Sequence, residues 1–135
     1  MSKSVIACVE DLFFRSKIEA TARHLNVPVV YVAAGDLAKA CADKNAAAVL
    51  LELSSNGDAL ASVRALRNGR VGAEMPVIGF LSHVDKALAR EAEAAGVSQV
   101  MPRSQFSETL PDLLMDLVAP GTKREVQEEP ELPDE

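Results

Sequence analysis

Short apolar runs alternate with stretches of helical periodicity along most of the chain, and this alternation limits the folds open to it. Residues 5–9 are almost continuously apolar, which is typical of a strand covered on both faces. Residues 13–25 then place Phe14, Ile18 and Leu25 on one helical stripe. Because the same order of strand and helix recurs along the chain, it predicts a parallel sheet with helices on both faces.

The expected elements form five strand–helix units. Strands are expected at residues 5–9, 27–32, 47–51, 75–81 and 97–101, and helices at residues 13–25, 36–45, 60–68, 85–95 and 106–118. Asp36 is a candidate N-cap of the second helix, and Gly96 is expected to end the fourth. Pro111 indicates that the regular part of the last helix begins late, with Thr109 as its cap. We expect a flavodoxin-like (βα)5 doubly wound parallel sheet with strand order 2-1-3-4-5.

Length and charge predict one soluble domain with an acidic tail. The 135 residues fit a single domain, expected at residues 1–119. Residues 120–135 include six acids and no base after Arg124, so they are expected to be disordered. The net charge of -6 argues against nucleic-acid and anionic-membrane partners. Without a signal-like or membrane-spanning run, the expected location is the cytoplasm of a bacterium.

The cysteines and aromatic residues describe the expected core. Cys8 and Cys41 each lie in an apolar run, which favours buried thiols over a disulfide or a zinc site. Aromatic residues make up 4% of the chain and tryptophan is absent, so we expect an aliphatic core.

Three carboxylates follow the expected first and third strands. Glu10 and Asp11 come after the first strand, and Glu52 comes after the third. These strands are neighbours in a 2-1-3-4-5 sheet, so we expect the three side chains to converge at its carboxyl edge. Converging acids raise one another's pKa unless a cation neutralises them, and Mg²⁺ suits such an oxygen-rich cluster. Arg103 is an alternative source of positive charge, and three solvated carboxylates at loop starts remain a further alternative.

The order of these motifs resembles the receiver domain of bacterial two-component response regulators. The resemblance rests on the acid pair after Val9, on residues 48–53 and 76–78, and on residues 92–97 leading to Pro102-Arg103. It covers residues 4–118, nearly the whole expected domain.

The resemblance implies a role for each residue at the strand ends. Glu10 and Asp11 match the Mg²⁺-binding carboxylates of receivers. Glu52 falls where receivers carry the phosphoaccepting aspartate, and Arg103 falls on the lysine that pairs with the phosphoryl group. The resemblance therefore implies an acidic pocket that once served phosphoryl transfer, with Mg²⁺ as a possible cofactor.

Four departures from the receiver pattern indicate a degenerate pseudo-receiver. Glu52 is one methylene longer than aspartate, and an error near 1 Å can cost about 10²-fold in such positioning chemistry. Leu81 replaces a threonine or serine hydroxyl, and Val100 replaces a switching aromatic ring. Arg103 keeps the charge of lysine on a larger planar head. We also hypothesise that Glu52 pairs with Arg103 and holds an active-like state without phosphate.

The expected function is that of a stand-alone pseudo-receiver module, not an enzyme, which signals by protein–protein interaction independently of phosphorylation. The resemblance places the partner, or a second copy in a homodimer, on the face formed by residues 85–95, 97–101 and 106–118. One alternative is a working receiver that accepts phosphate from a histidine kinase at an atypical site. A small flavodoxin-like ligand binder or enzyme ranks lower, because the sequence shows neither a nucleophile–base pair nor a flavin phosphate loop.

Overall fold

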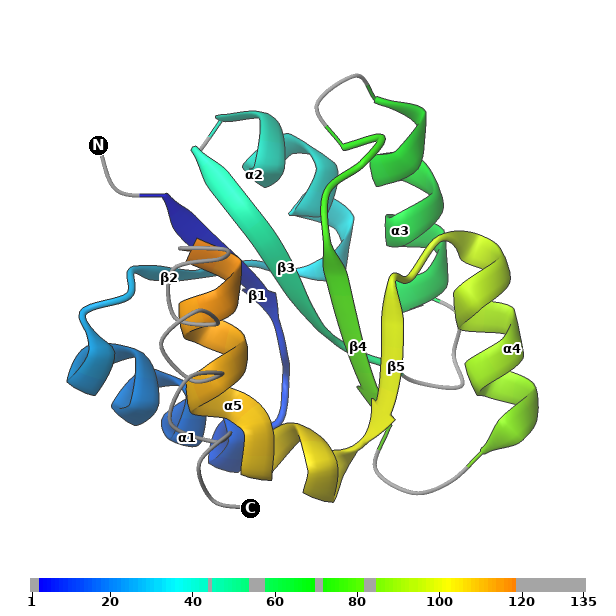
Figure 1. The fold of residues 1–135 in the computed structure, drawn as a ribbon. Helices are drawn as coiled ribbons and strands as arrows, with labels where there is room; N and C mark the ends of the chain where they lie inside the picture. The colour runs from blue at the N-terminus through cyan, green and yellow to red at the C-terminus, as the bar shows by residue number, and fades with distance from the viewer. Residues whose placement is uncertain (1–2, 44, 54–57, 70–71, 82–84, 119–135) are drawn as a thin grey trace, which may run out of the picture.

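The protein forms a five-stranded parallel sheet with strand order β2-β1-β3-β4-β5, as Figure 1 shows. The computed structural model describes residues 3–43, 45–53, 58–69, 72–81 and 85–118. The strands are β1 (Ser4–Cys8), β2 (Val29–Tyr31), β3 (Ala46–Glu52), β4 (Val77–Leu81) and β5 (Gln99–Pro102). The strand order predicted from the alternation of apolar and helical stretches is therefore confirmed.

Helices cover both faces of the sheet. They are α1 (Leu12–Leu25), a 3₁₀ turn η1 (Ala34–Asp36), α2 (Leu37–Asp43), α3 (Asp58–Asn68), α4 (Lys86–Ala95) and α5 (Arg103–Val118). Helices α1 and α5 pack on one face, and α2, α3 and α4 pack on the other (Figure 1). In the described part of the chain, no helix is long and apolar enough to cross a membrane.

Successive side chains of β1 point to opposite faces of the sheet, which explains why the strands are continuous apolar runs in the sequence. Val5 and Ala7 point into the layer under α1 and α5, while Ile6 and Cys8 point into the layer under α2, α3 and α4. All four are buried. A strand with a helical layer on each side has no face left for polar residues.

The core under α1 and α5 differs from the aliphatic core that the composition predicts. Phe80 and Phe106 stack with ring centroids 4.3 Å apart, and the ring of Phe14 meets that of Phe80 edge-on at 5.0 Å. All three are buried. Three of the five aromatic side chains of the protein are thus concentrated where β4 faces α1 and α5. Such pairs add about 0.5–1.5 kcal/mol each beyond area burial.

One of the expected helix ends is confirmed, one is wrong, and one stays a prediction. Gly96 ends α4 in the left-handed conformation, with φ of 119°, as predicted. Asp36 ends the 3₁₀ turn and directly precedes Leu37, the first residue of α2, so its role as the N-cap of α2 stays a prediction. Helix α5 begins at Arg103 and contains Pro111, and the Thr109 hydroxyl donates to the Gln105 carbonyl instead of capping. Burial of the inward face of α5, including Leu110 at 1% exposure, outweighs the loss of one helical hydrogen bond at proline.

Some expectations fall on residues that the structure does not describe. These are the residues of the acidic tail, expected at positions 120–135. The domain boundary near residue 119 therefore stays a prediction.

Arg67 on α3 connects two turns at the opposite edge of the sheet from the carboxylates. Its guanidinium donates from Nε and Nη2 to the Gly96 carbonyl, at 3.0 and 2.7 Å, and from Nη1 to the Gly72 carbonyl at 2.7 Å. A side chain at Gly96 would meet Cγ of Arg67 at 2.9 Å. The turn before β4 and the turn before β5 are thus both held by one side chain.

Replacing Arg67 with alanine should lower the free energy of unfolding by about 2–3 kcal/mol, because two partly buried carbonyls lose a charged donor. Urea unfolding measures the change. The matched control is Arg64→Ala on the same helix, whose exposed side chain should be worth less than about 0.5 kcal/mol. Equal losses in the two variants would contradict the structural role of Arg67.

Candidate functional site

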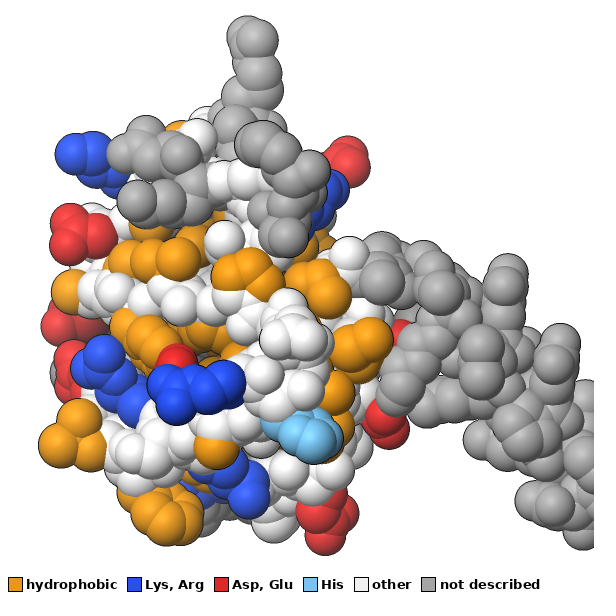
Figure 2. Space-filling model, turned by 90° about the vertical axis from the view of Figure 1, so that its left-hand side faces the viewer, with side chains coloured by type: hydrophobic (Ala, Val, Ile, Leu, Met, Phe, Trp, Pro, Cys, Tyr) orange, Lys and Arg blue, Asp and Glu red, His pale blue; other side chains and the backbone are white. Residues whose placement is uncertain are grey.

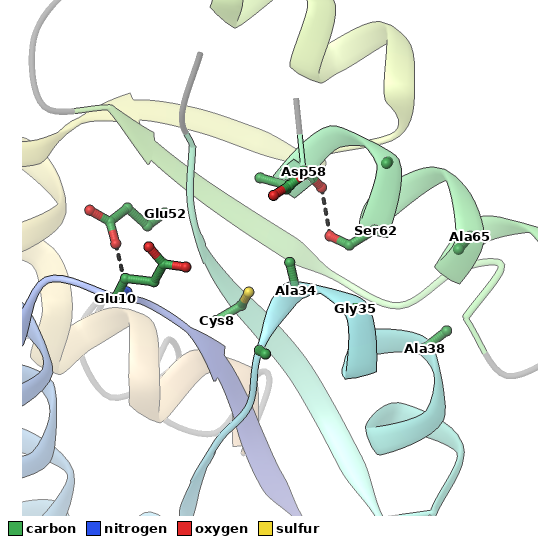
Figure 3. A pocket seen from close by; sticks show the side chains of 12 residues that line it. Cys8, Glu10, Ala34, Gly35, Ala38, Glu52, Asp58, Ser62 and Ala65 are labelled. Carbon is green, nitrogen blue, oxygen red and sulfur yellow. Dashed lines mark hydrogen bonds between the residues drawn. The ribbon is translucent and has the colours of Figure 1, made fainter. Parts of the chain in front are cut away.

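The three predicted carboxylates gather at the carboxyl edge of the sheet, where β1 and β3 lie side by side. Cys8 at the end of β1 is in register with Leu51 of β3, so the residues that follow each strand are neighbours. Oε1 of Glu52 accepts hydrogen bonds from the backbone N–H of Glu10 at 2.7 Å and of Asp11 at 3.2 Å. Figure 3 shows the Glu52 side chain reaching to the backbone of Glu10.

Glu52 therefore fixes the loop between β1 and α1. Its carboxylate satisfies two donors that precede a helix, where backbone N–H groups lack partners within the helix. Bonds from backbone N–H to a carboxylate are about twice as strong as neutral ones. The Glu52 side chain is partly exposed, and Glu10 is exposed. The hydrogen bond from the Glu10 amide to Glu52 therefore forms at the surface.

Asp11 uses both of its carboxylate oxygens. Oδ1 accepts from the backbone N–H of Phe14 at 3.2 Å and caps α1, while Oδ2 accepts from Nη2 of Arg103. The Phe14 hydrogen bond, followed by that of Arg103, lowers the pKa of Asp11 below its ordinary value. Asp11 is therefore a capping residue and an ion-pair partner as well as a member of the acidic edge.

Arg103 has two partners, and neither is Glu52. Its guanidinium carbon lies 4.4 Å from the centroid of the Phe14 ring, and its Nη2 donates to Asp11. The ring holds the guanidinium on the α1 side of the site, while Glu52 turns toward the backbone of the loop. The hypothesised pairing of Glu52 with Arg103 is absent from this arrangement, and the alternative role of Arg103 as a neutralising charge is the one it takes.

Leu81 and Val100 pack into the core on one face of the sheet. Leu81 is 5% exposed and belongs to the core layer under α2, α3 and α4, and Val100 is partly buried against the same layer. Neither brings a hydrogen-bonding side chain to the edge. Their correspondence to the receiver switch positions stays a prediction.

The hydrogen-bond donors around the carboxylates affect how readily these side chains could bind a metal ion. Both oxygens of Asp11 and Oε1 of Glu52 already accept hydrogen bonds. In the part of the chain that the structure describes, no group of three or more His, Cys, Asp or Glu residues is placed to hold a metal ion. In this arrangement Arg103 supplies positive charge beside Asp11. Mg²⁺ binding stays a prediction.

A hollow of about 590 Å³ lies beside Glu10 and Glu52, and sequence reasoning did not anticipate it. Alanines on η1, α2 and α3 line it, with Gly35 and Asp58 (Figure 3). None of its described lining residues is basic. The signal available in the sequence is the run of alanines on facing helices, whose short side chains leave the space between them open.

Cys8 also lines this hollow, but its thiol is a poor nucleophile. Burial, followed by the charges of Glu10 and Glu52, raises the pKa of Cys8 to about 11. The thiol therefore stays protonated near neutral pH, and nucleophilic attack requires the thiolate. The hollow offers space and negative charge without a reactive group.

Replacing Asp11 with asparagine should flatten the acid side of the stability curve. Because its folded-state pKa is lowered, Asp11 contributes stability that is complete above its ordinary pKa of 3.8 and is lost as the pH falls through the lowered value. Urea unfolding over this pH window measures the slope. Asp36→Asn, which alters an exposed acid in η1, is the control. An unchanged slope in Asp11→Asn would contradict the assigned partners.

Comparisons with known proteins give a match in structure alone. No protein-family model and no curated protein matches the sequence. The receiver domain of a sensor histidine kinase from Pseudomonas aeruginosa, solved with a magnesium ion in its active-site cleft, has a TM-score of 0.74 at 17% identity. That match covers 87% of this chain and 98% of the other.

Two further solved structures agree with it. A response regulator from Hahella chejuensis has a TM-score of 0.75 at 16% identity, over 87% of this chain and 96% of its own. Chemotaxis protein CheY4 of Vibrio cholerae has a TM-score of 0.73 at 17% identity, over 87% of this chain and 99% of its own. Because these matches span almost the whole of each structure and share the strand order 2-1-3-4-5, the chain has the fold of a response-regulator receiver domain.

Proposed function

We propose that this chain is a pseudo-receiver, a module of two-component signalling that binds a protein partner in a conformation independent of phosphorylation. The observation that carries the proposal is the hydrogen bonding of Glu52 to the backbone of Glu10 and Asp11. In the receivers that the chain resembles, the position of Glu52 belongs to the phosphoacceptor. Here that position is occupied by a carboxylate already engaged in holding the neighbouring loop.

Phosphoryl transfer depends on positioning and on charge neutralisation. An attack by Oε1 of Glu52 would break two backbone hydrogen bonds. The arginine that would stabilise a phosphoryl group already pairs with Asp11 and stacks on Phe14. Leu81 supplies no hydroxyl group to the product. Each of these features disfavours a phosphorylated state, and together they favour signalling through a fixed surface.

The surface formed by α4, β5 and α5 is the proposed partner face. β5 is an edge strand of the described sheet and pairs with β4 on one side. Gln99 is exposed on this strand, and Arg90 and Glu91 are exposed on α4, which gives the face mixed charge. A partner of complementary mixed charge suits this face, and a second copy of the chain is the alternative occupant.

The proposal is tested by incubating the protein with acetyl phosphate and Mg²⁺ and measuring its intact mass. We expect no gain of a phosphoryl group, because the acceptor position is engaged and its charge partner is taken. A receiver with an aspartate acceptor, treated in parallel, is the positive control. A stoichiometric phosphoryl gain that disappears in the Glu52→Gln variant would overturn the proposal and establish the working-receiver alternative.

The role of Glu52 in holding the loop has a separate test. In Glu52→Ala, the amides of Glu10 and Asp11 should exchange with solvent about tenfold faster, since each loses a hydrogen bond worth about 1–1.5 kcal/mol. Amide exchange followed by NMR measures the rates. Glu74→Ala, which removes an exposed acid before β4, is the matched control. Equal exchange rates in Glu52→Ala and wild type would remove the basis for a conformation held by Glu52.

A further inference from the structure

The outer face of α1 exposes two large apolar side chains next to the carboxylate edge. Leu12 is 73% exposed and Phe13 is 75% exposed. Both lie in the first turn of the helix, directly after Asp11. Fully burying a leucine or phenylalanine side chain is worth about 1.5–3 kcal/mol, so covering this turn would be favourable.

The same helix carries a surplus of positive charge in a chain whose net charge is -6. α1 holds Arg15, Lys17 and Arg23 against one acid, Glu19. By contrast, α4 and α5 together carry Lys86, Arg90 and Arg103 against Glu91, Glu93, Glu108, Asp112 and Asp116. The α1 face is therefore basic, while the helices on the partner side are neutral to acidic.

An open groove of about 830 Å³ runs along this face, and we call it the α1 groove. It is lined by Leu12, Arg15, Glu19, Arg23 and Tyr31, among others. The guanidinium carbon of Arg15 lies 4.7 Å from the centroid of the Tyr31 ring. Figure 2 shows this side of the molecule, with Lys and Arg side chains interspersed among hydrophobic ones. Arg23 pairs with Glu19 at 2.9 Å within the groove, and Arg15 leaves the lining with a surplus of positive charge. The groove thus suits an extended segment that combines acids with apolar residues.

We propose that residues 125–132 of the same chain dock in the α1 groove. This segment holds four acids, Glu125, Glu128, Glu129 and Glu131, and ends at Leu132. Val126 adds a second apolar side chain. The acids complement the basic residues of α1, and the apolar residues match the exposed first turn of the helix.

The path of the chain allows this contact. α1 and α5 both begin at the carboxyl edge of the sheet and run back along the same face, where Leu25 and Leu117 pack against one core layer. The tail therefore leaves α5 at the same end of the sheet as the last turn of α1. Helix α1 is roughly 21 Å long, and eight extended residues span roughly 26 Å, so residues 125–132 can cover it from end to end.

In this arrangement the tail covers Leu12, which lines the groove, and shields the α1 side of the carboxylate edge. Any protein that binds the α1 face must first displace the tail. The α4–β5–α5 face stays open, so the tail directs partners to one side of the molecule. The tail docking does not rest on the proposed pseudo-receiver function, because it uses none of the site residues.

Tyr31 is a built-in reporter for the test, because the chain has one tyrosine and no tryptophan. The full chain is compared with a tail-neutral variant that carries Glu125→Gln, Glu128→Gln, Glu129→Gln and Glu131→Gln. Acrylamide quenching of the Tyr31 fluorescence should rise about twofold in the variant at low salt. The difference should vanish at about 1 M salt, where the Debye length is about 3 Å.

A charge-matched control separates docking from a general effect of charge. It neutralises four exposed acids elsewhere, by Asp36→Asn, Glu74→Gln, Glu91→Gln and Glu93→Gln, and should quench like wild type. Equal quenching of the wild type and the tail-neutral variant at low salt would overturn the proposal. So would equal quenching of the control and the tail-neutral variant.

A spin label at Gln127→Cys locates the tail directly. Burial raises the pKa of both native thiols, Cys8 and Cys41, so the new cysteine is labelled preferentially. The amides of α1 should broaden in NMR spectra, and those of α4 should not. Broadening on another face would overturn the proposal, and broadening that grows with protein concentration would assign the groove to the tail of a second copy instead.

Discussion

The bonds from the Glu10 and Asp11 amides to the Glu52 carboxylate are the interaction on which the functional edge depends. They are possible because β1 and β3 are adjacent parallel strands that end level with each other. A carboxylate at the end of one strand can then reach the free N–H groups that precede the helix after the other. The sheet topology supplies the adjacency, and the extra methylene of glutamate supplies reach. Glu52 thereby holds the loop between β1 and α1.

The rest of the edge follows from how Arg103 is held. Phe14 packs in the core beside Phe80 and Phe106, and the outer side of its ring carries the guanidinium of Arg103. Asp11 then finds a cation within reach while it caps α1. One aromatic residue thus connects core packing to site electrostatics. It explains how a charge from within the chain comes to lie beside Asp11.

The sequence predicted the sheet order and the convergence of the three carboxylates, because both follow from alternation and topology. It did not predict which partner each carboxylate takes, since that depends on a few ångströms of side-chain reach. Glu52 accepts hydrogen bonds from the backbone, and Arg103 pairs with Asp11. Charge alone would equally have allowed Glu52 to pair with Arg103. The late helix start predicted from Pro111 was wrong for a related reason. Burial of the inward face of α5 stabilises the helix by more than the proline destabilises it. The hollow lined by alanines was not predicted, because a space between two helices does not change the hydrophobic periodicity of either helix.

A protein held in this way responds to partners by selection. The contacts of Glu52, Asp11 and Arg103 are all made within the chain, so no external ligand is needed to maintain them. Moving a two-state equilibrium from 1:99 to 99:1 takes about 5.5 kcal/mol of differential binding. A phosphoryl group on Oε1 of Glu52 would also replace two backbone hydrogen bonds and compete for an arginine that pairs with Asp11. A partner that binds the existing surface meets neither of these costs, which is the physical basis of the proposed pseudo-receiver function.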